Sequence, residues 1–457
     1  MRTRSVLSLV LASAAAASCL LQVETPSALD PVARDPGVRS GPAGAGDPIP
    51  GLTATELAFF RAGKEEFEES ETADEGLGPT MNLDACAGCH AQPAVGGTSP
   101  FINPQVAFAK KNGARNRIPS FIQSDGPVRE ARFIRNSDGT PDGGVHDLFT
   151  IAGRSDAPGC ALEQPDFDAQ LARGNVIFRI PTPVFGAGLI EQIPDKAILA
   201  NQASHASEKS AHGIRGRPNI VLAFHAISGQ SNKTGNDGTV ARFGWKAQNK
   251  SLLMFSGEAY NVEMGITNEL FQTERDETAG CQFARVPNSV TKVAERKALE
   301  AISAIEKFAF FQRFLAAPTP SRDTPGGAAS IENGRSLFVS VGCALCHTPT
   351  LRTGDSSVAA LRARDVNLYS DLLLHDMGVG LADGISQGQA GPREFRTAPL
   401  WGLGKRIFFL HDGRTPDLAV AIQAHRSSGS EANAVIRNFN RLAEREKQDV
   451  FNFLRSL

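Results

Sequence analysis

The sequence lacks a strong excess of charge of either sign. Its 457 residues carry 47 Lys and Arg against 49 Asp and Glu, so the formal net charge at pH 7 is −2. This balance gives no reason to expect nucleic acid or an anionic membrane surface as a partner. Hydrophobic residues make up 41% and charged residues 21% of the chain, as in a soluble globular protein. The length suffices for two or three domains with cores of their own.

The first residues also lack an apolar run long enough to stay in a bilayer. A basic start at 1–4 precedes an apolar stretch at 6–17 and then Ser18-Cys19. This pattern predicts a secretory signal peptide over 1–19 and a periplasmic location. "AASC" is similar to a lipoprotein cleavage box, but Ala16 stands where leucine is usual. A lipid anchor on Cys19 therefore stays open as the sole link to a membrane.

Cysteine is scarce, and most of it lies in one repeated pattern. "DACAGCH" at 84–90 and "GCALCH" at 342–347 both contain C-x-x-C-H. Two thiols at this spacing add to the vinyl groups of a haem, and the next histidine binds the iron. A redox dithiol or a zinc site would leave the repeated histidine unexplained. The sequence thus predicts two covalent haem c groups, with the following attachment and iron-binding residues: Cys86, Cys89, His90, Cys343, Cys346 and His347.

Two cysteines remain after these motifs and the leader. Cys160 and Cys281 form an even pair in a chain that we expect to be exported, where disulfides persist. We predict a disulfide between them, the alternative being two buried free thiols.

Composition along the chain predicts its organisation. Residues 20–51 are rich in Pro, Gly and Ala and predict a flexible tether. "TATE", starting at Thr53, is a capping box that opens the first helix. Residues 91–285 are rich in Gly and Pro and predict long loops with a few strands. A further helix is expected over 289–316, followed by a linker.

The C-terminal part shows the outline of a small cytochrome c domain. A helical segment leads into the second motif, and "LAEREKQDVFNFLRSL" closes the chain with an apolar helical face. We therefore expect a mostly α fold of two cytochrome c-like domains, over 52–317 and 328–457. The first would carry a long, loop-rich insertion with a few short strands.

The stretch "EFRTAPLWGLGKRIFFLHDGRTPDLAVAIQAH", at 394–425, resembles the C-terminal haem domain of bacterial di-haem cytochrome c peroxidases. It is also similar to the di-haem enzyme that matures methylamine dehydrogenase, and more distantly to rubber oxygenases. "GLGPTMNLDACAGCHAQPAVGG" and "YSDLLLHDMGVGLADG" are closer to a di-haem oxidoreductase family of thiol oxidoreductases or peroxidases.

The resemblance implies roles for further residues. His425 stands where the relatives have Met or Tyr as the distal ligand of the second haem, which implies a bis-histidine iron of low potential. Met377 and His411 are its rivals. Trp245 matches a tryptophan between the haems, and Glu263 matches a carboxylate that takes a proton from peroxide and returns it to the departing oxygen.

This chain also departs from the relatives. The spacing from Trp245 to Glu263 is two residues shorter, and residues 406–408 replace a calcium-binding T-A-P, which makes calcium doubtful. No histidine lies between the first motif and His146, which would either approach the first haem or form a structural hydrogen bond. The other histidines carry no signal: His205, His212, His225 and His375.

The resemblance implies a periplasmic di-haem c-type oxidoreductase, peroxidase-like, with peroxide as substrate. The C-terminal haem would transfer electrons and the N-terminal haem would react. A small electron-donor protein, of cytochrome c or cupredoxin type, would be the partner. Two alternatives remain, a di-haem cytochrome that only transfers electrons and a haem dioxygenase resembling the rubber oxygenases.

Overall fold

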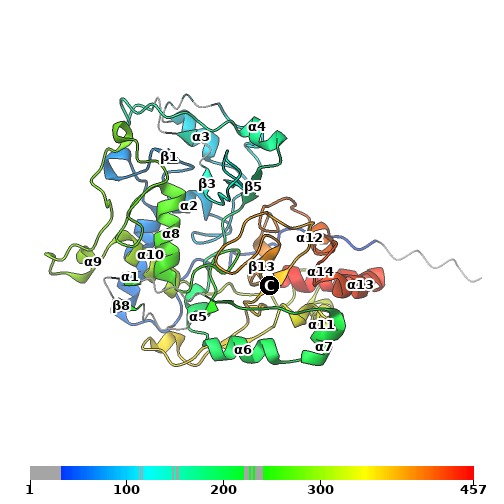
Figure 1. The fold of residues 1–457 in the computed structure, drawn as a ribbon. Coiled ribbons are helices and arrows are strands. Elements are labelled where there is room, and N and C mark those ends of the chain that lie inside the picture. Colours follow the sequence, from blue (N-terminus) through cyan, green and yellow to red (C-terminus); the bar gives the residue numbers. More distant parts are fainter. Residues whose placement is uncertain are drawn as a thin grey trace, which may run out of the picture.

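The computed structural model describes residues 32–457 except 112, 114, 116, 147, 148, 151–153, 221–225, 228, 229 and 232–239. The leader with Cys19, and His225, lie outside the described residues. Helices and loops dominate, and the strands are short (Figure 1). The expected helix-and-loop character is confirmed at this level, while the two-domain cytochrome c-like arrangement stays a prediction. None of the helices in the described part has the length and apolar character that crossing a bilayer requires.

The α-helices over 52–317, called the N-terminal half below, are α1 (Ala54–Glu68), α2 (Cys86–Cys89), α3 (Gln105–Lys111), α4 (Phe167–Ala172), α5 (Ala187–Glu191), α6 (Asp195–Ala203), α7 (Ala206–His212), α8 (Leu252–Met264), α9 (Ala298–Ala301) and α10 (Ala304–Phe314). Those over 328–457, the C-terminal half, are α11 (Ala328–Ser340), α12 (Leu418–Ala424), α13 (Asn433–Asn440) and α14 (Glu444–Ser456). One-turn 3₁₀ helices lie at Ala73–Glu75, Ala279–Cys281, Cys343–Leu345, Ala359–Leu361 and Leu403–Lys405.

The strands pair antiparallel in small sheets. One sheet has the order β3 (Val145–His146), β2 (Glu130–Phe133), β5 (Val176–Arg179). The two-stranded pairs are β1 (Thr80–Met81) with β4 (Phe149–Thr150), β6 (Asn219–Ile220) with β9 (Val240–Ala241), β7 (Ala226–Ile227) with β8 (Gln230–Ser231), β10 (Leu351–Arg352) with β11 (Asp365–Val366), and β12 (Leu374–Asp376) with β13 (Glu394–Arg396).

A crossed helix pair with a close backbone approach is found in each half. Helix α1 packs on α10, and α11 packs on α14. Each crossing has a glycine where the backbones approach. A Cβ on Gly63 would lie 2.2 Å from the Lys307 carbonyl oxygen, and one on Gly334 would lie 1.9 Å from that of Asp449. Only glycine permits contact this close. In each half, a glycine therefore allows the first helix to pack directly on the last.

A phenylalanine one turn after each glycine connects this crossing to a C-x-x-C-H histidine. Phe67 lies 5.7 Å from the ring of His90, and Phe338 lies 6.3 Å from that of His347. The spacing Gly-x-x-x-Phe puts both residues on one helix face. The two halves therefore present their motif histidines to equivalent helix pairs.

The capping box at the start of α1 is confirmed. The Glu56 amide donates to the Thr53 hydroxyl over 3.2 Å, and the Glu56 carboxylate accepts from the Thr53 amide over 2.7 Å. The helix expected over 289–316 is too long in the prediction, because helix is found only in α9 and α10. Ser303 and Glu306 form a capping box that starts α10, which stops the helix from extending backwards.

Residues 33–49, which the sequence predicts to be part of a flexible tether over 20–51, contact the folded parts of the chain. Asp35 forms a buried ion pair with Arg455 of α14 at 2.5 Å. The Arg39 amide donates to Gly404 over 2.7 Å, and the Ile49 amide donates to Phe314 over 2.7 Å. Composition did not reveal these contacts, because their partners lie several hundred residues further along the chain.

The insertion packs on the C-terminal half as well as on its own. Helix α6 contacts β10, and helix α7 contacts α13. The Asn201 amide donates to Thr348 over 3.0 Å, and Asn438 lies 3.3 Å from His212. The domain limits at 317 and 328 stay predictions, since these contacts cross them.

The predicted disulfide between Cys160 and Cys281 is confirmed. Both cysteines belong to the largest apolar core, which runs from Phe60 of α1 to Leu373 before β12. The bond thus ties the middle of the insertion to its end, inside the largest apolar core.

Candidate functional site

Both C-x-x-C-H motifs adopt a single helical turn. The His90 amide donates to the Cys86 carbonyl over 3.0 Å, and the His347 amide donates to Cys343 over 2.9 Å. The four thiols are unpaired and half-buried. The described residues hold no cluster of three or more His, Cys, Asp or Glu of the kind that a zinc site needs. The turn leaves each pair of thiols free to react with a single ligand.

The imidazoles of both motifs are oriented by backbone carbonyls. Nδ1 of His90 lies 2.9 Å from the Gly97 oxygen, and Nδ1 of His347 lies 3.0 Å from the Tyr369 oxygen. A carbonyl only accepts, so Nδ1 carries the proton in each ring. Nε2 is then left with a free lone pair, which is the state in which histidine binds a metal.

His425, at the end of α12, has the same arrangement. Its Nδ1 lies 2.8 Å from the Ala421 carbonyl oxygen, so its Nε2 is also free to bind. His425 and His347 line one cavity of about 210 Å³, together with Cys343 and Cys346. We call it the second cavity. The rivals Met377 and His411 line it too, and the His411 ring stacks on Phe395 at 4.4 Å.

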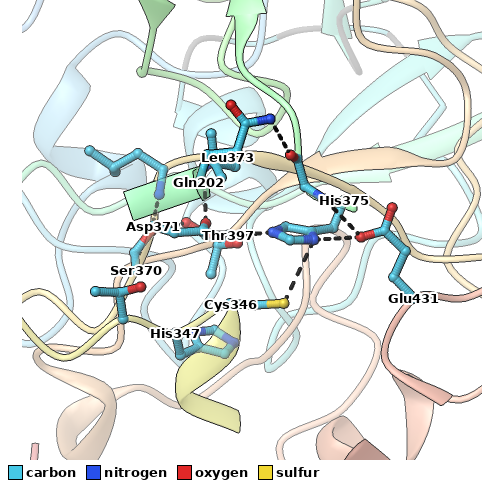
Figure 2. Close-up of polar contacts among 12 residues, drawn as sticks. Gln202, Cys346, His347, Ser370, Asp371, Leu373, His375, Thr397 and Glu431 are labelled. Atoms are coloured by element: carbon cyan, nitrogen blue, oxygen red, sulfur yellow. Dashed lines mark hydrogen bonds and ion pairs between the residues drawn. The ribbon is translucent and has the colours of Figure 1, made fainter. Parts of the chain in front are cut away.

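His375, in β12, lies at the same cavity with both ring nitrogens engaged (Figure 2). Nε2 is 2.9 Å from the Asp371 carboxylate, and Nδ1 is 2.7 Å from the Glu431 carboxylate and 3.6 Å from the Cys346 sulfur. A Cβ on Gly216 would lie 2.5 Å from the ring, so the backbone of the insertion closes over it. His375 is therefore held as a donor to two carboxylates and has no lone pair for iron.

The charge on His375 follows from these contacts. Burial opposes a charged ring, but Cys346 and the Asp371 carboxylate outweigh it and hold the pKa of His375 well above its usual value. Sequence reasoning missed this residue, because a single histidine in a strand is uninformative until its partners are known. The signal was the pair of acids at Asp371 and Glu431, 4 residues before it and 56 residues after it.

Two arginines line the second cavity without a carboxylate partner among the described residues. Arg396 ends β13 and Arg406 follows the turn at Leu403–Lys405. Burial lowers the pKa of each to about 10, and for Arg396 the neighbouring Arg406 lowers it further. In the sequence, residues 406–408 stand out only as a departure from a calcium-binding segment, and no local pattern predicts this arginine pair.

The first motif lines a separate, smaller cavity of about 60 Å³. We call it the first cavity. Cys86, Cys89 and Glu263 line it, and His90 is the one imidazole among its described lining residues. The predicted first-haem residues are thus brought together. A second imidazole opposite His90, which the second cavity has in His425 opposite His347, is not found among them.

Glu263, near the end of α8, shares the first cavity with Glu130 of β2. Burial raises the pKa of Glu263 well above its usual value, and the carboxylate of Glu130, which is hydrogen-bonded to it, raises it further. Arg132 donates to Glu130 over 2.8 Å. The two carboxyl groups therefore share one buried site, in which ionisation of Glu263 is opposed. The sequence did not reveal Glu130, since the loop-rich insertion delivers it.

Trp245 lines the second cavity, and its indole N–H donates to the Ile180 carbonyl over 3.0 Å. The next residue, Pro181, lines the first cavity. The resemblance implies a tryptophan between the haems. Trp245 lines the second cavity and is connected to the first through its hydrogen bond to Ile180 and the next residue, Pro181.

His146 lies at neither cavity. Its Nε2 is 2.6 Å from the Asp142 carboxylate, and its ring stacks on Phe133 at 3.7 Å. Burial lowers its pKa. Of the two alternatives left by the sequence, these contacts support the structural hydrogen bond.

A family model described as "Di-haem oxidoreductase, putative peroxidase" matches residues 132–457, which is more than half of the chain. The chain belongs to this di-haem oxidoreductase family. The match contains the second motif, Trp245, Glu263 and His425, and it starts after the first motif. Membership implies haem as the cofactor and oxidoreductase chemistry.

Comparison with curated proteins finds no match. Among solved structures, a chain of Kuenenia stuttgartiensis hydrazine synthase is similar, with 12% sequence identity over 100% of both chains and a TM-score of 0.35. A likeness at this TM-score supports no conclusion about fold or function.

The second cavity fits the group that the family implies. Its walls are mostly apolar, its thiols and free imidazole nitrogens face one space, and a buried Arg396 Nε there has no hydrogen-bond partner. Haem combines an apolar ring with an iron and two carboxylates, so each feature of the cavity has a counterpart.

Proposed function

We propose that the protein is a periplasmic di-haem c-type peroxidase in which the two haems have different roles. The observation that supports this most is the unequal lining of the two cavities. The second cavity has two imidazoles with free Nε2 atoms, His347 and His425, while the first has one, beside the acid Glu263.

The four motif thiols would hold the haems covalently, Cys86 and Cys89 one and Cys343 and Cys346 the other. His90 and His347 would bind the irons through Nε2, with their Nδ1 protons fixed on backbone carbonyls. When bound, haem supplies one-electron redox chemistry and, where a position on iron is open, the reduction of peroxide.

At the second motif, His425 would fill the remaining position and exclude peroxide. Its Nδ1 donates to Ala421, which orients Nε2 and raises its basicity. This site would store and pass electrons. Met377 and His411 stay rivals, because both line the same cavity.

At the first motif, Glu263 and Glu130 would handle the proton. Reduction of peroxide to two waters consumes two electrons and two protons, and it moves a proton from one oxygen to the other. A carboxyl group with a raised pKa can hold that proton, give it up and take it back. Arg132, which donates to Glu130, would orient that carboxylate, and Glu263 would be the proton carrier.

Trp245 would carry electrons between the two sites. Its ring lies at the second cavity, and its N–H fixes it to the Ile180–Pro181 backbone, which reaches the first cavity. Electrons would enter from a small donor protein of cytochrome c or cupredoxin type.

The dioxygenase alternative needs an apolar substrate pocket at an open haem. The first cavity contains two carboxyl groups, which supports peroxide as the substrate instead. The electron-transfer alternative needs a strong second ligand at both irons. The described lining of the first cavity has no second imidazole, which supports the peroxidase, and Met264 and Tyr260 are the side chains there that the electron-transfer alternative would have to use.

The proposal is tested on protein produced with haem attachment in the periplasm. Mass spectrometry of proteolytic peptides should find haem on both motifs, and a reduced cytochrome c should be oxidised only when peroxide is added. Attachment at both motifs without peroxide-dependent oxidation would favour electron transfer, and absence of haem from the first motif would refute the division of roles.

A further inference from the structure

Arg396 is a buried cation without a matching anion among the described residues. Its side chain is 5% exposed, its backbone is fixed by an amide hydrogen bond to Trp245 over 2.9 Å, and its Nε has no hydrogen-bond partner. A buried polar group left unpaired costs about 1–3 kcal/mol, and more when charged. Such a group is retained when a ligand satisfies it.

Arg406 places a second cation at the same cavity. Each guanidinium has its pKa lowered to about 10 by burial, and no acidic residue opposes this in either case. Two like charges in a shared, largely apolar space repel each other more strongly than they would in water. An anion that is not part of the protein chain would therefore stabilise the two guanidinium groups.

The acids near the cavity are already committed. Glu431 accepts from His375 and from the amides of Arg215 and Gly216, and Asp371 accepts from His375. His375 itself is a cation held between these two acids. None of these groups can serve as the counter-ion for Arg396 and Arg406 without releasing a partner.

The remaining walls restrict what the anion can be attached to. They are apolar and aromatic, as follows: Phe338, Leu400, Leu403, Phe409, Leu418 and Phe439. A ligand that fits must combine a flat or bulky apolar body with carboxylates at one edge. The two thiols of the cavity indicate that this ligand also has groups that react with thiols. The two free imidazole nitrogens indicate that it contains a metal.

We propose that Arg396 and Arg406 bind the two propionate carboxylates of the haem at the second motif. The inference rests on the proposed function, because it takes the thiols of Cys343 and Cys346 as the attachment points. Guanidinium and carboxylate pair through parallel hydrogen bonds, and arginine keeps its charge when buried. The pair would fix the haem edge opposite the thioether bonds and raise the reduction potential of this haem.

The test uses the haem-loaded protein and redox titrations followed by absorbance. In Arg396→Gln and Arg406→Gln, the potential of one haem should fall by about 59 mV or more, a tenfold change in its reduction equilibrium. The potential should also become dependent on pH between about 5 and 7, because the released propionates then bind protons on reduction. The other haem should keep its wild-type potential.

Arg393→Gln is the matched control. Arg393 lies three residues before Arg396, is exposed and pairs with Asp376, so its loss should leave both potentials unchanged. Arg396→Lys keeps a charge at the site and should retain most of the wild-type potential. If Arg396→Gln does not yield holoprotein, the lysine variant tests the inference instead. A wild-type potential in Arg396→Lys would support the need for a positive charge at this position.

Wild-type potentials and pH dependence in both glutamine variants would overturn the inference. The arginines would then be available to a carboxylate that another molecule brings. This failure differs from failure of the proposed function, in which wild-type protein carries no haem on the second motif or does not turn over peroxide.

Discussion

The two cavities start from the same five-residue motif and differ in what lies opposite its histidine. In both, a helical turn presents two thiols, and a carbonyl fixes Nδ1 of the imidazole. In the second cavity another imidazole and two arginines share an apolar space of about 210 Å³. In the first, a space of about 60 Å³ contains the Glu130–Glu263 acid pair. The motif thus specifies attachment, and the surrounding fold specifies reactivity.

The two cavities have the same helical surroundings at their motif histidines. Each motif histidine packs on a phenylalanine one turn after a glycine, where the first helix of the half crosses the last. Because these surroundings are the same in both halves, they do not account for the difference. The difference comes from α8 and β2 on one side and from α12 and β13 on the other.

The largest expected effect follows from removing the proton carrier of the first cavity. Glu263→Gln keeps the size and hydrogen-bonding capacity of the side chain but holds no exchangeable acid proton. Peroxide turnover should fall about a hundredfold or more, the usual scale for loss of an acid–base group, while both haem spectra stay unchanged. Steady-state oxidation of a reduced donor measures this.

Glu277→Gln, an exposed substitution in the same half, should leave turnover unchanged. Glu130→Gln sharpens the comparison further. Since the Glu130 carboxylate raises the pKa of Glu263, its loss should move the pH profile of turnover to lower pH. Wild-type turnover in Glu263→Gln would make the carboxylate a bystander.

An intermediate effect is expected where the helices cross. Gly334→Ala brings a methyl group against the Asp449 carbonyl in α14, and Gly63→Ala brings one against Lys307 in α10. Overpacking of this kind costs about 1–3 kcal/mol of unfolding free energy. Thermal unfolding should show the loss in both variants, with the spectrum of a different haem perturbed first in each.

Glu332→Ala, on the exposed face of α11, should be close to neutral. Equal perturbation of both haems by each glycine variant would contradict the view that the two helix pairs support their motifs separately.

The smallest effect concerns pH and His375. Its folded pKa is raised above the usual 6.5, so its contribution to stability is fully present below that value and is lost as pH rises through the folded pKa. The stability gap between wild type and His375→Gln should be about 1 kcal/mol at pH 6 and should shrink in alkaline solution. Urea unfolding at several pH values measures the gap, and a gap that widens with pH would contradict the assignment of charge.

Local patterns were enough to predict part of this molecule. The C-x-x-C-H turns, the Thr53 capping box and the helices before the second motif and at the C-terminus depend on neighbouring residues. The Cys160–Cys281 bond followed from counting, once four cysteines were assigned to motifs. His425, Trp245 and Glu263 came from a resemblance, and the structure places each of them at a motif cavity.

What sequence reasoning missed depends on partners distant in the chain. Glu130 becomes relevant only beside Glu263, and Arg396 only beside Arg406 inside an apolar wall. The role of His375 could be recognised only from its contact with Glu431. The contacts of the segment at 33–49 could be recognised only from the ion pair between Asp35 and Arg455. A local cap at Ser303 overrode helical periodicity over 289–297. Pairing of charges across the fold leaves no periodic trace in a sequence.

In the proposed division of roles, one iron is open and the other is closed by His425. Low-temperature EPR of the ferric protein distinguishes these two states. We expect one high-spin signal that responds to peroxide and one low-spin signal that does not, with no absorbance at about 695 nm from methionine ligation. His425→Ala should convert the low-spin signal to high-spin, and Met377→Ala should leave it intact. Two low-spin signals in the wild type, or a low-spin signal that survives His425→Ala and disappears in Met377→Ala, would contradict the account.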